Sequence, residues 1–211
     1  MKITVFGGTG RTGQHIVRQA LDAGHEVAAV VRDPARLPIS HSALEVITAD
    51  LTSPAPLRPA LTGREAVISA IGPRTRKDVG VASNATRVIL RAMDQSDIRR
   101  VVLLSAAPVG PVPEGESLIY RTVLYPLLRR ILRDPYADLA AMEEEARRSN
   151  TEWTVIRPPR LTDKPLTERY RREIGSNVPR GHFLSRADLA HAMLAALEDP
   201  ATVKQPVGVA Y

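Results

Sequence analysis

A glycine-rich loop near the start of the chain carries the clearest chemical signal in the sequence. An apolar run over residues 3–6 comes directly before it, and an amphipathic helical pattern follows it. Gly8, Gly10 and Gly13 satisfy the spacing G-x-G-x-x-G, and Gly7 adds a further glycine on the N-terminal side. Such glycines let the backbone approach a pyrophosphate, which the N–H groups at the start of the helix attract. The pattern therefore predicts a dinucleotide-binding site.

Positive charge gathers where the second predicted strand ends. Arg32 follows its apolar run, Arg36 lies a turn later, and Arg11 stands in the glycine loop. Guanidinium groups bind phosphate in a bidentate geometry, so this cluster favours the 2′-phosphate of NADP. An NAD-specific site usually has a carboxylate here, and the neighbouring Asp33 leaves NAD as the alternative. We expect NADPH to be preferred over NADH.

Two further turns are expected beside the same cofactor. Asp50 and Leu51 follow the third strand, where the carboxylate would accept from the adenine amino group and the leucine would pack on the ring. A local turn or helix cap is the alternative role for Asp50. Gly72 follows the fourth strand at the carboxyl edge of the sheet, where ligands bind in open α/β sheets. Its missing side chain would permit a close approach to the cofactor.

Alternating strand and helix patterns position these residues. Strands are expected at Lys2–Phe6, Glu26–Arg32, Leu44–Ala49, Ala66–Ile71, Val101–Leu104 and Trp153–Arg157, with a final short strand near Val207–Ala210 closing the sheet edge. Helices are expected at about Thr12–Ala23, Val79–Gln95, Asp138–Ser149 and Ala187–Glu198, the last with Ser185 as its N-cap. Continuous apolar strands are typical of sheets covered on both faces. The chain is therefore predicted to be α/β, a doubly wound Rossmann-type, mostly parallel sheet with helices on both faces.

Residues 108–135 break this alternation and are expected to form a helical insertion after the fifth strand. The segment contains five prolines and then an apolar helical face made of Leu124, Leu127, Leu128, Ile131 and Leu132. Arginines lie off that face, and a basic amphipathic helix can bind a membrane, cover a substrate pocket or pack on the core. Because the stretch is short and lacks Trp and Phe, we expect core packing or a lid over the substrate pocket.

The composition bounds the remaining possibilities. A chain of 211 residues suits one domain, and the absence of cysteine excludes disulfides, thiolate metal sites and cysteine nucleophiles. No apolar run reaches the ~20 residues of a spanning helix, so a cytoplasmic protein without a membrane partner is expected, as a monomer or small homo-oligomer. The net charge of +6 comes from 25 arginines and four lysines, which we interpret mainly as compositional bias. Nucleic-acid binding is not expected, because aromatic residues make up only 4% of the chain.

Two other groups of polar residues are interpreted as structural. The five histidines have no metal-ligand spacing, so no metal site is expected, and His182 is taken as an ordinary loop residue. The run Glu143–Glu145 is expected to be a solvated helix face that pairs with Arg147 and Arg148.

Segments along almost the whole chain resemble the NmrA-like group of atypical short-chain dehydrogenase/reductases, and most closely its biliverdin-IXβ reductase/flavin reductase type. The matching segments are FGGTGRTG, VVRDPARLP, the Asp50-Leu51 turn, AVISAIGPR, VVLLSA, WTVIRPPRLTDKPLT and LSRADLAHAML, and residues 108–135 match least well. The resemblance implies an NADP-binding domain. In it, the pyrophosphate would be held by Gly7, Gly10, Arg11, Thr12 and Gly13, and the 2′-phosphate by Arg32 and Arg36. The nicotinamide ribose would lie beside Gly72, and the nicotinamide itself would be surrounded by Ser105, Pro158 and Pro159.

The chain departs from the wider superfamily in its proton donor. None of its tyrosines is followed four residues later by lysine, so the Tyr-x-x-x-Lys pair is missing. Flat conjugated acceptors such as flavins, quinones and bilins can take a hydride and draw the proton from water, which a site supplying only alignment can support. Ser105 would then anchor a ligand or relay a proton, or serve only as a strand-end hydroxyl. Arg160 and Lys164 would clamp an anionic acceptor, or be plain surface charge.

Two functions follow from these patterns. The first is an NADPH-dependent oxidoreductase that transfers a hydride to a small conjugated acceptor. The alternative is a non-catalytic regulator of the NmrA-like type that senses NADP, which the missing Tyr-x-x-x-Lys pair favours.

Overall fold

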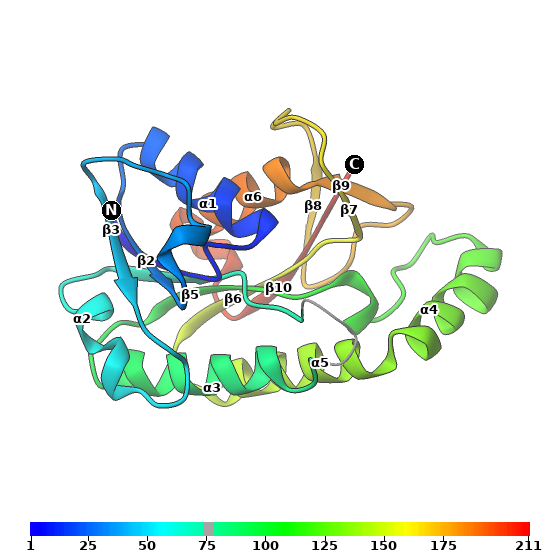
Figure 1. The fold of residues 1–211 in the computed structure, drawn as a ribbon. Coiled ribbons are helices and arrows are strands. Elements are labelled where there is room, and N and C mark those ends of the chain that lie inside the picture. The colour runs from blue at the N-terminus through cyan, green and yellow to red at the C-terminus, as the bar shows by residue number, and fades with distance from the viewer. Residues whose placement is uncertain (74–77) are drawn as a thin grey trace.

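A mostly parallel, eight-stranded sheet runs through the centre of the molecule (Figure 1), in a computed structural model that describes residues 1–73 and 78–211. The strand order is β3-β2-β1-β4-β5-β6-β10-β8, and only β8 is antiparallel to its neighbour. These strands are β1 Lys2–Phe6, β2 Glu26–Val31, β3 Leu44–Thr48, β4 Ala66–Ser69, β5 Arg100–Leu104, β6 Glu152–Arg157, β8 Arg171–Ile174 and β10 Gln205–Ala210. A separate two-stranded sheet pairs β7 (Arg160–Thr162) with β9 (Phe183–Ser185).

Two helical layers cover the sheet. On one face α1 packs against α6, and on the other α3 packs against α5 (Figure 1). The helices are α1 Arg11–Asp22, α2 Arg58–Leu61, α3 Val81–Asp94, α4 Tyr125–Ile131, α5 Arg133–Arg148 and α6 Arg186–Glu198. Ser185 caps α6 as predicted, because its hydroxyl oxygen accepts from the N–H of Asp188 at 2.9 Å.

The core has two apolar layers because successive side chains of a strand point to opposite faces of the sheet. Val5 of β1 packs into the layer that contains Ile16 of α1 and Met193 of α6. Phe6, the next residue, packs into the layer that contains Ile89 of α3. The predicted doubly wound α/β fold is confirmed. The strand order reverses at β1, so the loops after β1 and β4 diverge and leave the crevice where such sheets bind ligands.

One sheet edge differs from the prediction. The strand near Val207–Ala210 exists as β10, but β8 lies outside it and forms the edge. All four residues of β8 are exposed, so the segment has no apolar alternation that sequence patterning could detect. The strands β7 and β9 have three residues each, which is too short for such a pattern.

The segment 108–135 contains helical turns, but Leu124, Leu127 and Ile131 of its expected apolar face are exposed, so the expectation of core packing is wrong for these three residues. The alternative, a lid over a substrate pocket, stays a prediction. A π-helical turn (Tyr120–Leu124) leads into α4, and Leu127 and Ile131 are exposed. Tyr125 is the one residue of α4 that is buried. Its hydroxyl donates to the carbonyl oxygens of residues 108 and 110, and these bonds turn the apolar face outward.

Candidate functional site

Tight backbone contacts shape the loop between β1 and α1. Gly7 has φ +79°, and a Cβ on it would lie 2.8 Å from the carbonyl carbon of Ala70. A Cβ on Gly13 would lie 2.1 Å from the carbonyl oxygen of Gly7. The N–H of Gly10 donates to that same oxygen at 2.9 Å. The loop therefore needs Gly7 and Gly13 for its own packing against β4 and α1.

The N-terminus of α1 opens onto this loop without any capping side chain. Gly10 is the N-cap residue, and the first turn contains no acidic side chain. The first N–H groups of a helix have no partner within the helix, and they carry partial positive charge. Arg11 and Thr12 begin the helix here, with Thr12 buried. This end of α1 can therefore accept an anionic group such as a pyrophosphate.

A cavity of about 320 Å³ lies beside the loop and the end of β2, lined by Thr9, Arg32, Asp33 and Arg36. Asp33 accepts from the N–H of Ala35 at 3.1 Å and so caps the short 3₁₀ turn Pro34–Arg36. Two guanidinium groups thus line the cavity, while the one carboxylate is engaged by its own turn. A cavity of similar size, between Glu26 and Arg64, lies at the amino ends of the strands, away from this loop.

Arg11 is not among the residues that line the cavity. Its guanidinium donates to Asp163, in the loop after β7, and Arg186 donates to the same carboxylate at 2.7 Å. The carboxylate of Asp163 therefore links the glycine loop to the start of α6.

The residues expected to contact the adenine and the nicotinamide ribose follow the ends of β3 and β4. Asp50 accepts from the hydroxyl of Thr52 at 2.6 Å and from its N–H at 3.1 Å, and these bonds lower the pKa of the Asp50 carboxyl. Leu51 is half-buried against the apolar layer. A Cβ on Gly72 would meet no described atom within 4 Å, so the protein's own packing does not require glycine there. Arg74, which ends the AVISAIGPR segment, lies outside the described residues.

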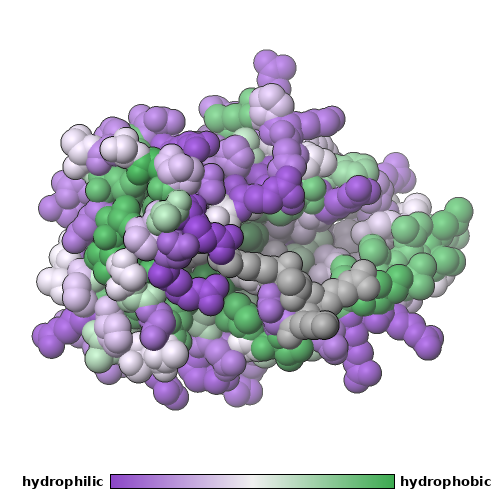
Figure 2. Space-filling model, in the orientation of Figure 1, coloured by the Kyte–Doolittle hydropathy of each residue, from purple (hydrophilic) through white to green (hydrophobic). Residues whose placement is uncertain are grey.

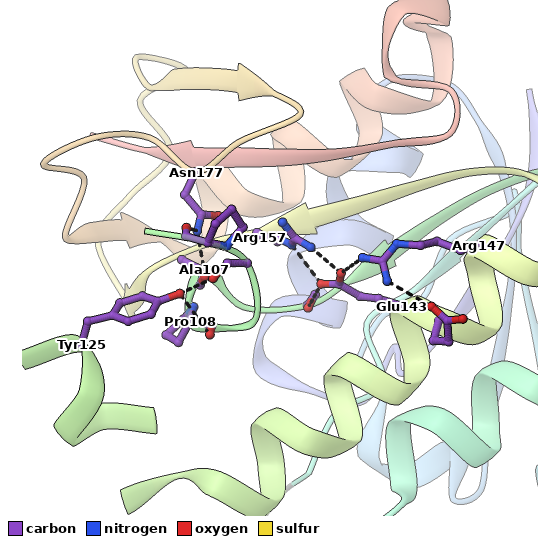
Figure 3. Close-up of polar contacts among 11 residues, drawn as sticks. Ala107, Pro108, Tyr125, Glu143, Arg147, Arg157 and Asn177 are labelled. Atoms are coloured by element: carbon purple, nitrogen blue, oxygen red, sulfur yellow. Dashed lines mark hydrogen bonds and ion pairs between the residues drawn. The ribbon is translucent and has the colours of Figure 1, made fainter. Parts of the chain in front are cut away.

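Beyond the end of β5, Ser105 joins a buried network of charges (Figure 3). Its hydroxyl donates to Glu143 at 2.7 Å, and its N–H donates to the carbonyl oxygen of Ile156 at 2.8 Å. Arg157 donates to both carboxylate oxygens of Glu143, at 3.0 and 2.5 Å. Arg147 adds a bond at 2.8 Å. Every acceptor oxygen of this carboxylate is therefore occupied.

The position of Glu143 corrects the prediction of a solvated glutamate run. Its side chain is only 1% exposed and that of its partner Arg157 only 5%. Glu144 behaves as predicted and forms exposed pairs with Arg147 and Arg148. A signal for the buried pair was present: an arginine that ends an apolar strand needs strong hydrogen-bond acceptors if it is buried, and a carboxylate is the strongest of these.

The loop after β5 is held against the end of β6 (Figure 3). Asn177 donates to the carbonyl oxygens of Ala107 at 2.8 Å and Pro111 at 2.9 Å, and the N–H of Ala107 donates to Pro158 at 2.8 Å. Pro158 is buried and Pro159 is half-buried. These bonds fix Ser105 and the two prolines on neighbouring strand ends, and Asn177 is a contributor that sequence patterning missed.

The predicted clamp residues are exposed at the edge of this region. The Arg160 guanidinium lies 5.8 Å from the ring centroid of Phe183, a cation–π contact between β7 and β9. Lys164 is exposed. The ring of His182 lies 5.0 Å from that of Tyr120. No group of described side chains could hold a metal ion, and no helix in the described ranges is long and apolar enough to cross a membrane.

Fold and site together define a Rossmann-type protein that binds a nicotinamide dinucleotide. The chain belongs to the NAD(P)H-binding family, whose family model matches residues 7–200.

Among curated proteins, the chain is similar to the photosystem II assembly factor Ycf39 of Synechocystis, 29% identical over 118 residues that make up 54% of this chain and 36% of that protein. An uncharacterized chloroplast protein of Arabidopsis thaliana is 30% identical over 175 residues, which are 79% of this chain and 61% of that protein. The chain thus spans less than two thirds of the length of either relative.

Solved structures agree on the fold. A short-chain dehydrogenase/reductase from Veillonella parvula in complex with NADP has a TM-score of 0.80 and 21% identity, and the match covers 100% of this chain and 94% of that one. A candidate NADH-flavin reductase from Streptococcus pneumoniae has a TM-score of 0.79 and 24% identity, covering 100% and 99%.

Proposed function

We propose that this chain is an NADPH-dependent reductase that transfers a hydride to a flat conjugated acceptor such as a flavin, a quinone or a bilin. The observation that carries the proposal is the cavity at the end of β2, where Arg32 and Arg36 stand beside an uncapped, positively polarised helix end. The Veillonella parvula structure with NADP, similar over the whole chain, supports the choice of cofactor.

The residues present fit NADP at its phosphate groups. Backbone N–H groups from Arg11, Thr12 and Gly13 would hold the pyrophosphate at the end of α1, beside the N-cap Gly10, where Gly7 lets the loop turn tightly. Arg32 and Arg36 would hold the 2′-phosphate in bidentate geometry. Asp33 uses only Oδ1 to cap its own turn, so the two arginines, and not the engagement of this carboxylate, support the choice of NADP over NAD.

At the other end of the cofactor, Gly72, Ser105, Pro158 and Pro159 would surround the nicotinamide, which supplies the hydride when bound. The Ser105 hydroxyl donates its hydrogen bond to Glu143, so toward a ligand its oxygen would act as an acceptor. Ser105 is therefore an anchor and not a proton donor. With no Tyr-x-x-x-Lys pair in the sequence, the acceptor takes its proton from water, which suits a conjugated ring.

The acceptor would lie between the nicotinamide and the exposed cations of β7 and of the loop after it. Arg160, oriented by the ring of Phe183, and Lys164 would attract an acidic group on it, such as a flavin phosphate. Asp50 and Leu51 would border the adenine at the opposite end.

Titration of NADPH and NADH by fluorescence tests the cofactor. The double variant R32A/R36A should weaken NADPH binding about a hundredfold or more, since hydrogen bonds to charged groups contribute about 1.5–3 kcal/mol each, and leave NADH binding unchanged. Arg91→Ala, at an exposed arginine of α3, is the matched control. Equal affinity of the native protein for both nucleotides would contradict NADP selection.

Turnover is tested separately by NADPH oxidation with FMN, riboflavin and a quinone. The reductase proposal expects oxidation with at least one of them. Tight NADPH binding without turnover on any conjugated acceptor would favour the NADP-sensing regulator, the reading that the missing Tyr-x-x-x-Lys pair allows.

A further inference from the structure

Large apolar side chains stand exposed along the segment that contains the π-helical turn and α4. Their exposed fractions run from 46% to 76%. We call this group the apolar ridge, and it consists of Leu118, Ile119, Val123, Leu124, Leu127 and Ile131. Figure 2 shows hydrophobic side chains gathered over this end of the molecule, on the α4 side. A contiguous exposed apolar patch of this kind marks an interaction surface.

Positive charge predominates along the ridge, although Glu116 and Asp134 flank its two ends and Arg129 lies over the ring of Tyr125. Residues 118–133 contain four arginines and no acidic residue. All four arginines are exposed, and within the described ranges none forms an ion pair: Arg121, Arg129, Arg130 and Arg133. The partner of this surface must therefore combine an apolar interior with negative charge at its border.

The shape of the segment restricts the partner further. In Figure 1, α4 projects from the end of α5, beyond the edge of the central sheet. Tyr125 anchors the inner side of α4, since its hydroxyl donates to the carbonyl oxygens of Pro108 and Gly110. Burial raises the pKa of Tyr125, which keeps this hydroxyl protonated. The ridge is thus a fixed, convex surface, and a convex surface does not enclose a peptide as a groove does.

We propose that the apolar ridge lies on an anionic lipid surface. Leu124, Leu127 and Ile131 enter the boundary between head groups and acyl chains, and the arginines bind the lipid phosphates. The association is peripheral, so it needs no spanning helix. It departs from the sequence-based expectation of no membrane partner, which assumed that the apolar face would be covered by the core or a pocket.

A second copy of the chain is a poorer occupant. A two-fold contact through the ridge would place the four arginines of one copy beside those of the other, and like charges in contact are repelled. Lipid phosphates neutralise the same groups.

Co-sedimentation with vesicles tests the proposal. The native protein should bind vesicles that contain phosphatidylglycerol at least about tenfold more strongly than vesicles of phosphatidylcholine alone, because each basic residue near an anionic surface contributes about 1 kcal/mol. Added salt should reduce the difference. The variant L127S/I131S should lose binding to both vesicles, and R129E/R130E should lose the preference for anionic ones.

The variant R91E/R99E is the matched control, because it changes the net charge equally at exposed arginines away from the ridge. It should bind as the native protein does. Equal binding to both vesicles, absence of binding, or an equal loss in the control would overturn the proposal. So would a dimer that L127S/I131S dissociates in light scattering without any vesicle binding. NADPH affinity, measured on each variant, should stay unchanged, so a failure here is separate from any failure of the proposed function.

Discussion

At the scale of single residues, Glu143 shows how one buried charge organises the end of two strands. Its carboxylate accepts from Ser105, from Arg157 twice and from Arg147. A buried ion pair repays its desolvation only when the remaining hydrogen-bonding groups are satisfied, and removing one partner leaves an uncompensated charge. The network therefore fixes the Ser105 hydroxyl and also makes the site costly to alter.

Glu143→Gln should destabilise the protein by about 3 kcal/mol, because the buried Arg157 then lacks a counter-charge. Glu144→Gln is the matched control, since it is the same substitution at the next residue, and its exposed pairs should contribute less than about 1 kcal/mol. Urea unfolding of the two variants measures both values. If the two substitutions destabilised the protein equally, Glu143 would behave as a solvent-exposed residue, as the sequence predicted.

Ser105→Ala should lower kcat for NADPH oxidation by about fivefold, the value of one net hydrogen bond of about 1 kcal/mol. Because the anchor role assigns no proton transfer to this hydroxyl, the pH profile of kcat should keep its shape. Ser53→Ala, at an exposed serine, is the control. A profile that loses a limb in Ser105→Ala would show instead that the hydroxyl relays a proton.

At the scale of elements, the loop between β1 and α1 is held by backbone contacts that no side chain can replace. A Cβ at position 13 would lie 2.1 Å from a backbone oxygen, whereas one at Gly72 would meet no described atom within 4 Å. The fold therefore requires glycine at position 13, whereas a glycine at position 72 would be required only by a bound ligand.

Gly13→Ala should destabilise the protein by about 1–3 kcal/mol, the usual cost of overpacking, and weaken NADPH binding because the loop must shift. Gly72→Ala should leave stability near that of the native protein and weaken NADPH binding only. Thermal unfolding and fluorescence titration of both variants distinguish these outcomes. Unchanged NADPH affinity in Gly72→Ala would remove that residue from the proposed site.

Elements with strong local patterns could be predicted from the sequence, and those set by tertiary contacts could not. Strands β1 and β2 are continuous apolar runs, and the glycine loop between β1 and α1 has its own spacing. β8 is exposed along its length, so only its pairing with β10 defines it. The outward turn of α4 depends on the contacts of Tyr125 with distant carbonyls, which the helical periodicity of its leucines does not contain.

At the scale of the whole molecule, Asp188 ties together segments that are distant in sequence. The carboxylate stands at the start of α6 and accepts from the N–H groups of Thr167 and Glu168, from Ser185 and from the hydroxyl of Tyr211. It therefore joins the loop after β7, β9, α6 and the last residue of the chain, which together border the proposed acceptor region.

The hydrogen bonds of Asp188 lower the pKa of its carboxyl, so the stability of the protein should depend on pH. Burial raises the pKa, but the hydrogen bonds from Tyr211, Thr167, Glu168 and Ser185 outweigh burial and lower it to about 2. A carboxyl whose folded pKa lies below its ordinary value of 3.8 stabilises the fold above that ordinary value. This stability, about 2–3 kcal/mol, is lost as the pH falls from about 4 to about 2.

Asp188→Asn should therefore destabilise the protein by about 2 kcal/mol at neutral pH and flatten the acid limb of the stability curve. Urea unfolding of both proteins across that pH range measures the difference, and Asp94→Asn, at an exposed position of α3, is the control. As Asp188 becomes protonated, the free energies of unfolding of the native protein and of Asp188→Asn should become more similar. If the difference between them stays constant down to about pH 2, ionisation of Asp188 does not cause the loss of stability in acid. NADPH affinity is a separate measurement on the same variant, because the start of α6 is connected to the phosphate-binding loop through Arg186, Asp163 and Arg11.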